Sequence, residues 1–254
     1  MLRIGPSGLG GVKEAVANLQ EFSKHKIKAC EIAFTYGVYI KTQKDAEEIG
    51  QTAKKLDITL SIHAPYYINL NSDDPKKVHN SKQRILECCK VGTWLGVKRV
   101  VFHAGFYGKN KESAYENIKK QIQELIKECK EKKYTPQLCP EIMGKINVFG
   151  SIEEIHKLSE ETGCGFCIDF AHILARYKDY KFEEVLNLFK TKEEIQIHFS
   201  GIEYGEKGEK NHKDTTKEDW KNLLNHLPKN RDFLIISESP NPFRDAIQAI
   251  ELSS

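Results

Sequence analysis

The amino-acid sequence predicts a single (β/α)8 TIM barrel, and three observations support this prediction. Apolar, strand-like runs alternate with longer amphipathic segments from one end of the chain to the other. Eight such strand-helix units follow in series, and eight is the number at which a parallel sheet closes into a barrel. The length of 254 residues suits a fold that typically takes about 250 residues. We expect one catalytic domain over residues 1–254, with a doubly wound open sheet as the alternative.

The expected strands are short apolar runs bounded by turn residues. In order, they cover Leu2–Gly5, Ala29–Phe34, Thr59–His63, Arg99–His103, Gln137–Ile142, Gly165–Asp169, Ile195–Phe199 and Phe233–Glu238. Runs of this kind are typical of strands that are buried on both faces of a parallel sheet. The serial pattern therefore predicts a parallel rather than an antiparallel sheet.

The segments between the strands have the composition of amphipathic helices. Clear examples are VKEAVANLQEFSKH, QKDAEEIGQTAKKL, KESAYENIKKQIQELIKECKEK and SIEEIHKLSEETG. In the last of these, Ser151 is placed as an N-cap, Glu154 completes a capping box, and Gly163 marks the end. The stretch Gly201–Thr216 is the longest polar segment that contains glycines, and we expect a loop there. It follows the seventh strand, on the side of a barrel where loops carry function.

Composition places few limits on the partners of the chain. Hydrophobic residues make up 39% and charged residues 30%, and no apolar run approaches the roughly 18 residues of a membrane helix. The start, MLRIGPSGLGG, lacks the pattern of a signal peptide. We therefore expect a cytoplasmic protein that does not bind membranes. The formal charge of +3 is compatible with a polyanionic partner but is too small for a basic DNA-binding tail.

The seven cysteines are predicted to be reduced core thiols. Most of them lie in apolar segments of a chain without secretory features. Cys164 and Cys167 form a C-x-x-C pair, which can indicate a redox or zinc motif. Here the pair lies in a strand-like run, where positions three apart face opposite ways. A structural role is therefore the favoured interpretation.

Six consecutive strands end on a histidine, an aspartate or a glutamate. These residues are His63, His103, Glu141, Asp169, His198 and Glu238. A single histidine after an apolar strand is more often a hydrogen-bonded core residue than a ligand. Six together are different, because the carboxyl ends of barrel strands meet at one rim, where the active sites of such barrels lie. His172, just after the sixth strand, and His212, in the long loop, are further candidates.

This mixture of imidazole and carboxylate predicts a site for transition-metal ions. It suits zinc, manganese or iron better than calcium or magnesium. The set exceeds what one ion can use, and a carboxylate can bridge two ions, so we expect two or more ions, with zinc, manganese and iron all open. Such centres act on phosphate esters. The remaining histidines fall in helical segments and are expected to be structural or exposed: His25, His79, His156 and His226.

Taken in order, several segments resemble the endonuclease IV family of apurinic/apyrimidinic endonucleases. They are GPSGLGG, SIHAPYYINL, VVFHAG, PEI, CIDFAHILA, IHFSG and ISESP. The resemblance covers essentially the whole chain. It implies a trinuclear metal barrel that acts in DNA base-excision repair as a monomer on duplex DNA. The implied reaction hydrolyses the backbone 5′ of an abasic site and leaves a 3′ hydroxyl and a 5′ deoxyribose phosphate.

The same resemblance assigns the ligands to three ions. His63, His103 and Glu141 would hold the first, and Glu141 would bridge to a second. Asp169, His198 and Glu238 would complete the second ion, and His172 and His212 would contribute to the third. Glu141 would also be the catalytic residue that steers the attacking hydroxide.

The chain departs from the family pattern in two places. The family carries an aspartate two residues before the histidine of the third-metal loop, and this chain has Lys210 there. Glu209 or Asp214 can substitute, and the sequence does not choose between them. The DNA-penetrating arginine of the family is replaced in FTYGVYIK by Tyr36 and Tyr39.

A further tyrosine keeps DNA recognition plausible. Tyr66 matches the family's aromatic that enters the duplex at the lesion, and stacking by an aromatic can replace the missing base. The interpretation is that Tyr66, Tyr39 and Tyr36 bind DNA, with simple loop packing as the alternative.

Two other functions remain open at this stage. The quartet Glu141, Asp169, His198 and Glu238 also resembles the site of metal-dependent sugar isomerases and epimerases in related barrels. Those enzymes need acid and base carboxylates or a lysine more than additional histidines. A third possibility is a DNA-lesion binder that has lost turnover through its altered third site.

Overall fold

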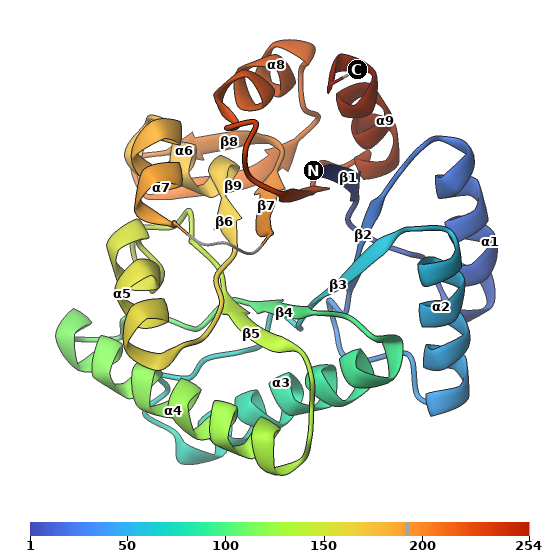
Figure 1. Ribbon diagram of the computed structural model, residues 1–254. Coiled ribbons are helices and arrows are strands. Elements are labelled where there is room, and N and C mark those ends of the chain that lie inside the picture. Colours follow the sequence, from blue (N-terminus) through green and yellow to red (C-terminus); the bar gives the residue numbers. More distant parts are fainter. Residues whose placement is uncertain (191–193, 254) are drawn as a thin grey trace.

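The computed structural model describes residues 1–190 and 194–253 and confirms the predicted (β/α)8 barrel. Residues 191–193 and 254 of the expected domain lie outside the described residues. The eight barrel strands are β1 (Leu2–Pro6), β2 (Ala29–Ala33), β3 (Thr59–His63), β4 (Arg99–Phe102), β5 (Gln137–Pro140), β6 (Ile168–Asp169), β7 (Ile195–Phe199) and β10 (Phe233–Ser237). Figure 1 shows them as an inner ring that is surrounded by helices.

The strands pair in parallel in two arcs, β1-β10-β7-β6 and β2-β3-β4-β5. Single bridges join the arcs, Ser7 to Glu31 on one side and Glu141 to Cys167 on the other. The β1–β2 junction needs a glycine, because a Cβ at Gly5 would lie 1.6 Å from the carbonyl oxygen of Ala29. The barrel is thus closed, and the ends of all its strands surround one axis.

Nine helices occur in the described part of the chain. They are α1 (Val12–Lys24), α2 (Gln43–Lys55), α3 (Pro75–Leu95), α4 (Lys111–Glu131), α5 (Ile152–Thr162), α6 (Phe170–Tyr177), α7 (Phe182–Leu188), α8 (Lys217–His226) and α9 (Pro242–Ser253). Helix α5 has the predicted ends, with a capping box between Ser151 and Glu154 and a left-handed Gly163 at its C-cap. None of the described helices is long and apolar enough to cross a membrane.

Side chains inside the barrel form layers that follow the two-residue period of the strands. Two residues before the strand-end ligands lie Ser61, Val101, Cys139, Cys167 and Gln196, all of them buried. This layer is part apolar and part polar, and it forms the floor on which the ligand layer rests. All seven cysteines are buried, Cys164 and Cys167 included.

Gly201–Thr216 is mostly a β-hairpin, which corrects the prediction of a loop. Strand β8 (Gly201–Gly205) pairs in antiparallel fashion with β9 (Gly208–Lys213), with an irregularity at Glu203 and Tyr204. Its polar composition concealed the strands because the hairpin packs against α6 and the loop at Gly144 and is otherwise half-buried or exposed. Two smaller differences concern β5, which ends at Pro140, and β6, which has only two residues.

Candidate metal centre

All eight predicted ligands converge at the carboxyl ends of the strands. His63 and Asp169 are the last residues of β3 and β6, and His198 lies in β7. Three others directly follow β4, β5 and β10, namely His103, Glu141 and Glu238. His172 comes from α6 and His212 from β9. With Glu209 added, these side chains form three groups whose potential ligand atoms lie within 4.8 Å of one another in each group.

The first cluster consists of His63, His103 and Glu141. The Nε2 atoms of His63 and His103 lie 3.3 Å and 2.8 Å from Oε2 of Glu141. The other ring nitrogen of His63, Nδ1, is 2.8 Å from the carbonyl oxygen of Ala64. As a donor to that carbonyl, Nδ1 leaves the Nε2 lone pair aimed at the cluster.

The second cluster consists of Glu141, Asp169, His198 and Glu238. His198 Nδ1 lies 2.8 Å from Glu141 Oε1 and 3.3 Å from Glu238 Oε1. Asp169 caps α6, since its Oδ1 accepts a 2.7 Å hydrogen bond from the backbone of His172. Its other oxygen, Oδ2, is buried and makes no hydrogen bond with the described residues. Glu141 belongs to both clusters, with one oxygen directed to each.

The third cluster consists of His172, Glu209 and His212. His172 Nε2 lies 3.4 Å from Glu209 Oε2, while its Nδ1 is 2.9 Å from the carbonyl oxygen of Ile142. His212 Nδ1 is held 2.7 Å from the hydroxyl of Ser200. Both histidines are therefore oriented by partners outside the cluster.

The structure separates the two carboxylates that could replace the aspartate missing before His212. Glu209 lies in the third cluster, whereas Asp214 bonds to Arg244 at 2.9 Å and to Asn241 at 2.8 Å. Lys210 is directed away from the cluster, with its amine 3.5 Å from Glu203. The lysine therefore adds no charge between the ligand atoms.

The pKa values of the clustered groups are shifted by burial and by the charges of their neighbours. Burial raises the pKa of Asp169 to about 8. Burial would also raise the pKa of Glu141, but the charge of His198 and hydrogen bonds from His103, His198 and His63 hold it well below its usual range. Burial opposes protonation of His63, yet Glu141 outweighs it and raises the pKa of His63 to about 9.

These observations fit divalent metal ions. Buried carboxylates need a partner, and Oδ2 of Asp169 accepts no hydrogen bond from the described residues, although it lies 3.4 Å from Nδ1 of His172. Each cluster combines imidazole with carboxylate, the donor set that zinc, manganese and iron share. Such an ion would displace the protons that these groups otherwise retain.

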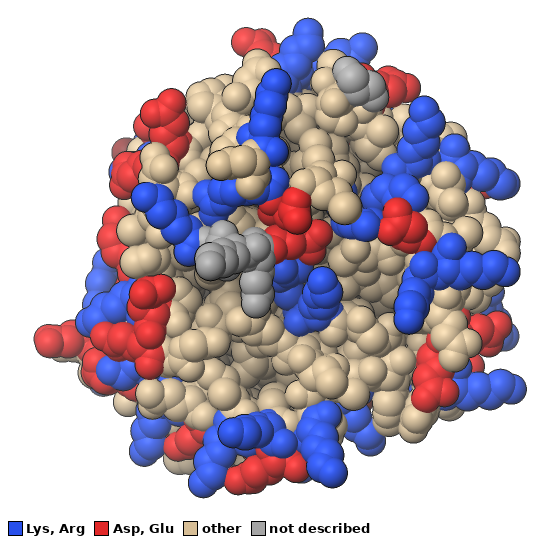
Figure 2. Space-filling view, in the orientation of Figure 1, with Lys and Arg blue, Asp and Glu red and all other residues tan. Residues whose placement is uncertain are grey.

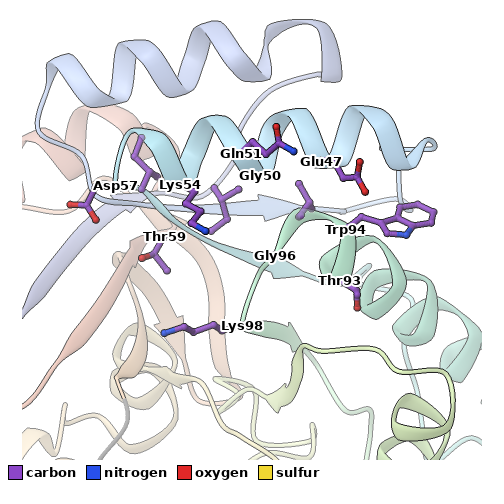
Figure 3. A pocket seen from close by; sticks show the side chains of 13 residues that line it. Glu47, Gly50, Gln51, Lys54, Asp57, Thr59, Thr93, Trp94, Gly96 and Lys98 are labelled. Atoms are coloured by element: carbon purple, nitrogen blue, oxygen red, sulfur yellow. The ribbon is translucent and has the colours of Figure 1, made fainter.

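A cavity of about 320 Å³ opens onto the three clusters, and its walls are largely apolar. It is lined by ligands and by Tyr66, Ile68, Phe106, Met143, Val148 and Lys145, among others. A larger cavity, of about 510 Å³, lies elsewhere, between α2 and α3 at the amino ends of β3 and β4 (Figure 3). It contains lysines and acids at its edge but none of the clustered ligands, so the smaller cavity is the candidate site.

The three predicted DNA-contacting tyrosines occupy different surroundings. Tyr66 is 57% exposed at the cavity wall, with its ring stacked 5.6 Å from that of His103. Tyr36 is 84% exposed. Tyr39 instead packs edge-on against Phe34 at 5.1 Å and joins the core. Packing therefore accounts for Tyr39.

Glu31 is a residue of the site that the sequence did not predict. This residue of β2 is fully buried and lies 3.2 Å from the Nε2 atom of His198. The signal that could have revealed it is a single acidic residue within the apolar run ACEIAF. The four histidines expected to be structural or exposed belong to none of the three clusters.

Comparison with known proteins gives one family match over most of the chain. A family model described as xylose isomerase-like TIM barrel matches residues 19–253. An uncharacterized protein of Methanocaldococcus jannaschii is 36% identical over 267 aligned residues, which cover 97% of this chain and 95% of that protein. A probable endonuclease 4 of Acholeplasma laidlawii is 29% identical over 163 residues, which cover 60% of this chain and 53% of that protein.

Solved structures share the fold at low sequence identity. Endonuclease IV from Thermus thermophilus superposes with a TM-score of 0.69 at 18% identity, covering 99% of this chain and 97% of its own. The protein SacUVDE gives a TM-score of 0.77 at 20% identity, with coverage of 95% and 86%. D-psicose 3-epimerase from Clostridium cellulolyticum gives 0.67 at 14% identity, with coverage of 94% and 92%. Nucleases and sugar epimerases thus share this barrel.

Proposed function

The chain belongs to the xylose isomerase-like TIM barrel family, and from this premise we propose that it is a metal-dependent endonuclease of DNA base-excision repair. In this proposal it acts as a monomer on duplex DNA and hydrolyses the phosphodiester on the 5′ side of an abasic site. The observation that carries the proposal is the set of three ligand clusters, two of which share Glu141. The relatives and solved structures named as endonucleases support it.

The proposed ligands follow the clusters. The first cluster would hold one ion, the second cluster another, and the third cluster a third, with Glu209 in the role of the missing aspartate. The ions are proposed to be zinc, with manganese or iron as alternatives of similar ligand preference. When bound, such ions supply Lewis-acid chemistry: they neutralise phosphate charge and make hydroxide available near neutral pH.

Glu141 is the proposed catalytic residue. Its carboxylate is fully buried, remains ionised, and is approached by His63, His103 and His198 from three sides. A carboxylate held this firmly can orient a nucleophile without reorganising during the reaction. Its two oxygens face different clusters, which suits a group that must position an attacking oxygen between two centres of positive charge.

Recognition of the lesion is assigned to two exposed aromatics, of which Tyr66 lies at the cavity. Tyr66 lies at the cavity wall, and Tyr36 presents nearly its whole ring to solvent. An exposed aromatic next to the cleavage site can stack where a base is missing. The apolar cavity walls suit a sugar that has lost its base, while Lys145 offers a cation for phosphate.

Sugar epimerisation is the competing function. The second cluster alone matches the one-ion quartet of such enzymes, and the epimerase structures share the fold. The first and third clusters argue against this reading, since they add four histidines for which a one-ion sugar site has no use. A non-cleaving lesion binder is the second alternative, if the third cluster holds its ion too weakly.

One experiment separates these functions. The purified protein, loaded with zinc or manganese, is incubated with a duplex that contains one abasic analogue, with a matched undamaged duplex and with free ketoses. We expect incision of the abasic duplex alone, and we expect chelator to abolish it. Ketose epimerisation with intact DNA would establish the sugar reading, and tight abasic binding without incision would establish the lesion binder.

A further inference from the structure

Glu31 is a fully buried carboxylate for which the proposed mechanism has no role. It lies on β2, and its side chain enters the barrel interior one layer below the ligands. Its Oε2 accepts hydrogen bonds from the hydroxyl of Ser61 at 2.9 Å and from the amide of Gln196 at 2.7 Å. A carboxylate is unfavourable in such a place unless it serves a partner.

His198 lies between Glu31 and the second cluster. Its Nε2 atom is 3.2 Å from the Glu31 carboxylate. Its Nδ1 atom faces the opposite way, 2.8 Å from Glu141 and 3.3 Å from Glu238. The imidazole is fully buried, so each nitrogen must find its partner within the protein.

The two nitrogens of a neutral imidazole cannot play the same part. One carries a proton and donates, and only the other has a lone pair for a metal ion. On the Nε2 side, the Gln196 amide nitrogen lies 3.2 Å away, but it is a donor that already faces Glu31. The Cys167 thiol also lies near His198, and a thiol is a weak acceptor beside a carboxylate. Glu31 is therefore the strong acceptor on this side.

From this geometry we propose that Glu31 is a positioning residue for the metal centre. It accepts the Nε2 proton of His198 and thereby leaves the Nδ1 lone pair directed at the second cluster. The inference rests on the proposed metal centre, which it deepens by adding a residue that no cluster contains. Ser61 and Gln196 also donate hydrogen bonds to the Glu31 carboxylate, and with both in place the loss of one of them leaves the contact with His198 intact.

The proposed contact has two consequences for the ion in the second cluster. It fixes the ring orientation and tautomer of His198, and the negative charge makes the imidazole a stronger ligand. Loss of such a partner weakens metal binding by about 10- to 100-fold in comparable centres. The loss should be largest for the ion that His198 holds, because His198 is the one cluster ligand for which a hydrogen bond to the Glu31 carboxylate is seen among the described residues, whereas His63 feels only the charge of Glu31.

The first test needs no variant. Zinc-loaded protein labelled with ¹⁵N-histidine is measured by long-range ¹H–¹⁵N correlation, which distinguishes protonated, unprotonated and metal-bound ring nitrogens. We expect His198 to show a protonated Nε2 and a metal-bound Nδ1. A protonated Nδ1, or a metal-bound Nε2, would overturn the inference.

The second test compares three variants by competition with a chromophoric chelator. Glu31→Ala removes the acceptor and should weaken one ion at least about 10-fold, and Glu31→Gln, which keeps an acceptor oxygen, should have a smaller effect. Ser61→Ala is the matched control, because it removes a hydrogen bond to the same carboxylate but does not touch His198. It should leave all affinities within about threefold.

The outcomes separate this inference from the proposed function. Unchanged affinities in Glu31→Ala, or an equal loss in Ser61→Ala, would mean that Glu31 is only structural. If Glu31→Ala does not fold, the comparison of Glu31→Gln with Ser61→Ala decides in the same way. A wild-type protein that binds no ion would instead overturn the metal centre itself, and the inference with it.

Discussion

At the scale of single residues, Glu141 connects the first two clusters. The three histidines around it keep it ionised although it is fully buried. Substitution by glutamine preserves the size of the side chain but removes its charge and one ligating oxygen. The consequences should therefore fall on chemistry rather than on the shape of the site.

Glu141→Gln is expected to reduce single-turnover incision of abasic DNA by at least about 100-fold. Affinity for the uncleaved abasic duplex should change much less, because recognition is assigned to other residues. Glu203→Gln is the matched control, since Glu203 is an exposed glutamate on β8 that pairs with Lys210 outside the clusters. Near-normal turnover of Glu141→Gln would remove this residue from the mechanism.

Glu209 and Asp214 offer a paired test of the third ion. Glu209→Gln removes the only carboxylate of the third cluster as the structure describes it, so one ion should bind at least about 10-fold more weakly. Asp214→Asn should leave metal content unchanged, because Asp214 is held by Arg244 and Asn241. Stepwise chelation followed by elemental analysis measures both. An effect of Asp214→Asn equal to that of Glu209→Gln would contradict the assignment.

At the scale of elements, the hairpin of β8 and β9 carries Glu209 and His212 to the site. The hairpin contacts the β5–α5 loop backbone to backbone at Gly208. A Cβ on Gly208 would lie 2.1 Å from the carbonyl oxygen of Gly144, so the contact requires a glycine. Gly208 also has a φ of 89°, where a side chain is strained. The positions of Glu209 and His212 in the third cluster therefore depend on this contact.

Gly208→Ala is accordingly expected to displace the hairpin and weaken the third ion while the other two remain bound. Gly163→Ala is the control: Gly163 has a comparable φ of 72° at the end of α5, but a Cβ there would meet nothing within 4 Å. Both variants should lose about 1 kcal/mol of stability from backbone strain. Metal titration together with thermal unfolding distinguishes the two variants. Equal metal binding by both would contradict the conclusion that the contact at Gly208 positions the third cluster.

The strand ends could be predicted from the sequence because barrel geometry brings them together wherever they occur along the chain. That reasoning identified His63, His103 and Asp169 without knowledge of any contact. It could not choose between Glu209 and Asp214, because the choice depends on how an irregular hairpin folds back. It also missed Glu31, whose role arises from a cross-barrel contact with His198 that no local pattern records.

At the scale of the whole molecule, the net charge is small, and on the face shown in Figure 2 charges of both signs are mixed. Lysine and arginine side chains are interspersed with acidic ones over the face shown in Figure 2, and the formal charge is only +3. If the proposed DNA substrate is correct, basic groups near the site, such as Lys145, would attract it rather than a field of one sign over the molecule.

The stability of the metal-free protein should fall as pH rises from about 6.5 to 9. Burial raises the pKa of Asp169 to about 8. Burial opposes protonation of His63 and His172, but Glu141 outweighs it at His63 and Asp169 outweighs it at His172. The pKa of each histidine is therefore raised to about 9. These groups bind more protons folded than unfolded, so their stabilisation is present at low pH and is lost as pH passes those values. Burial lowers the pKa of His212, so this one group changes the stability in the opposite direction to the three groups above.

Thermal unfolding of chelator-treated protein across this pH range measures the effect. The metal-loaded protein should vary less, because bound ions have already displaced the protons. A melting temperature of the metal-free protein that stays constant or rises between these pH values would show that the clustered groups do not retain their protons.

The most direct measurement is incision of a duplex that holds one natural abasic site, followed while zinc is returned stepwise to chelator-treated protein. Both ends of the product are identified. We predict that incision returns only with the ions. The upstream fragment should end in a 3′ hydroxyl, and the abasic residue should remain on the downstream fragment. No incision by fully loaded protein, or an upstream end left by elimination rather than hydrolysis, would contradict a metal centre that hydrolyses the backbone 5′ of the lesion.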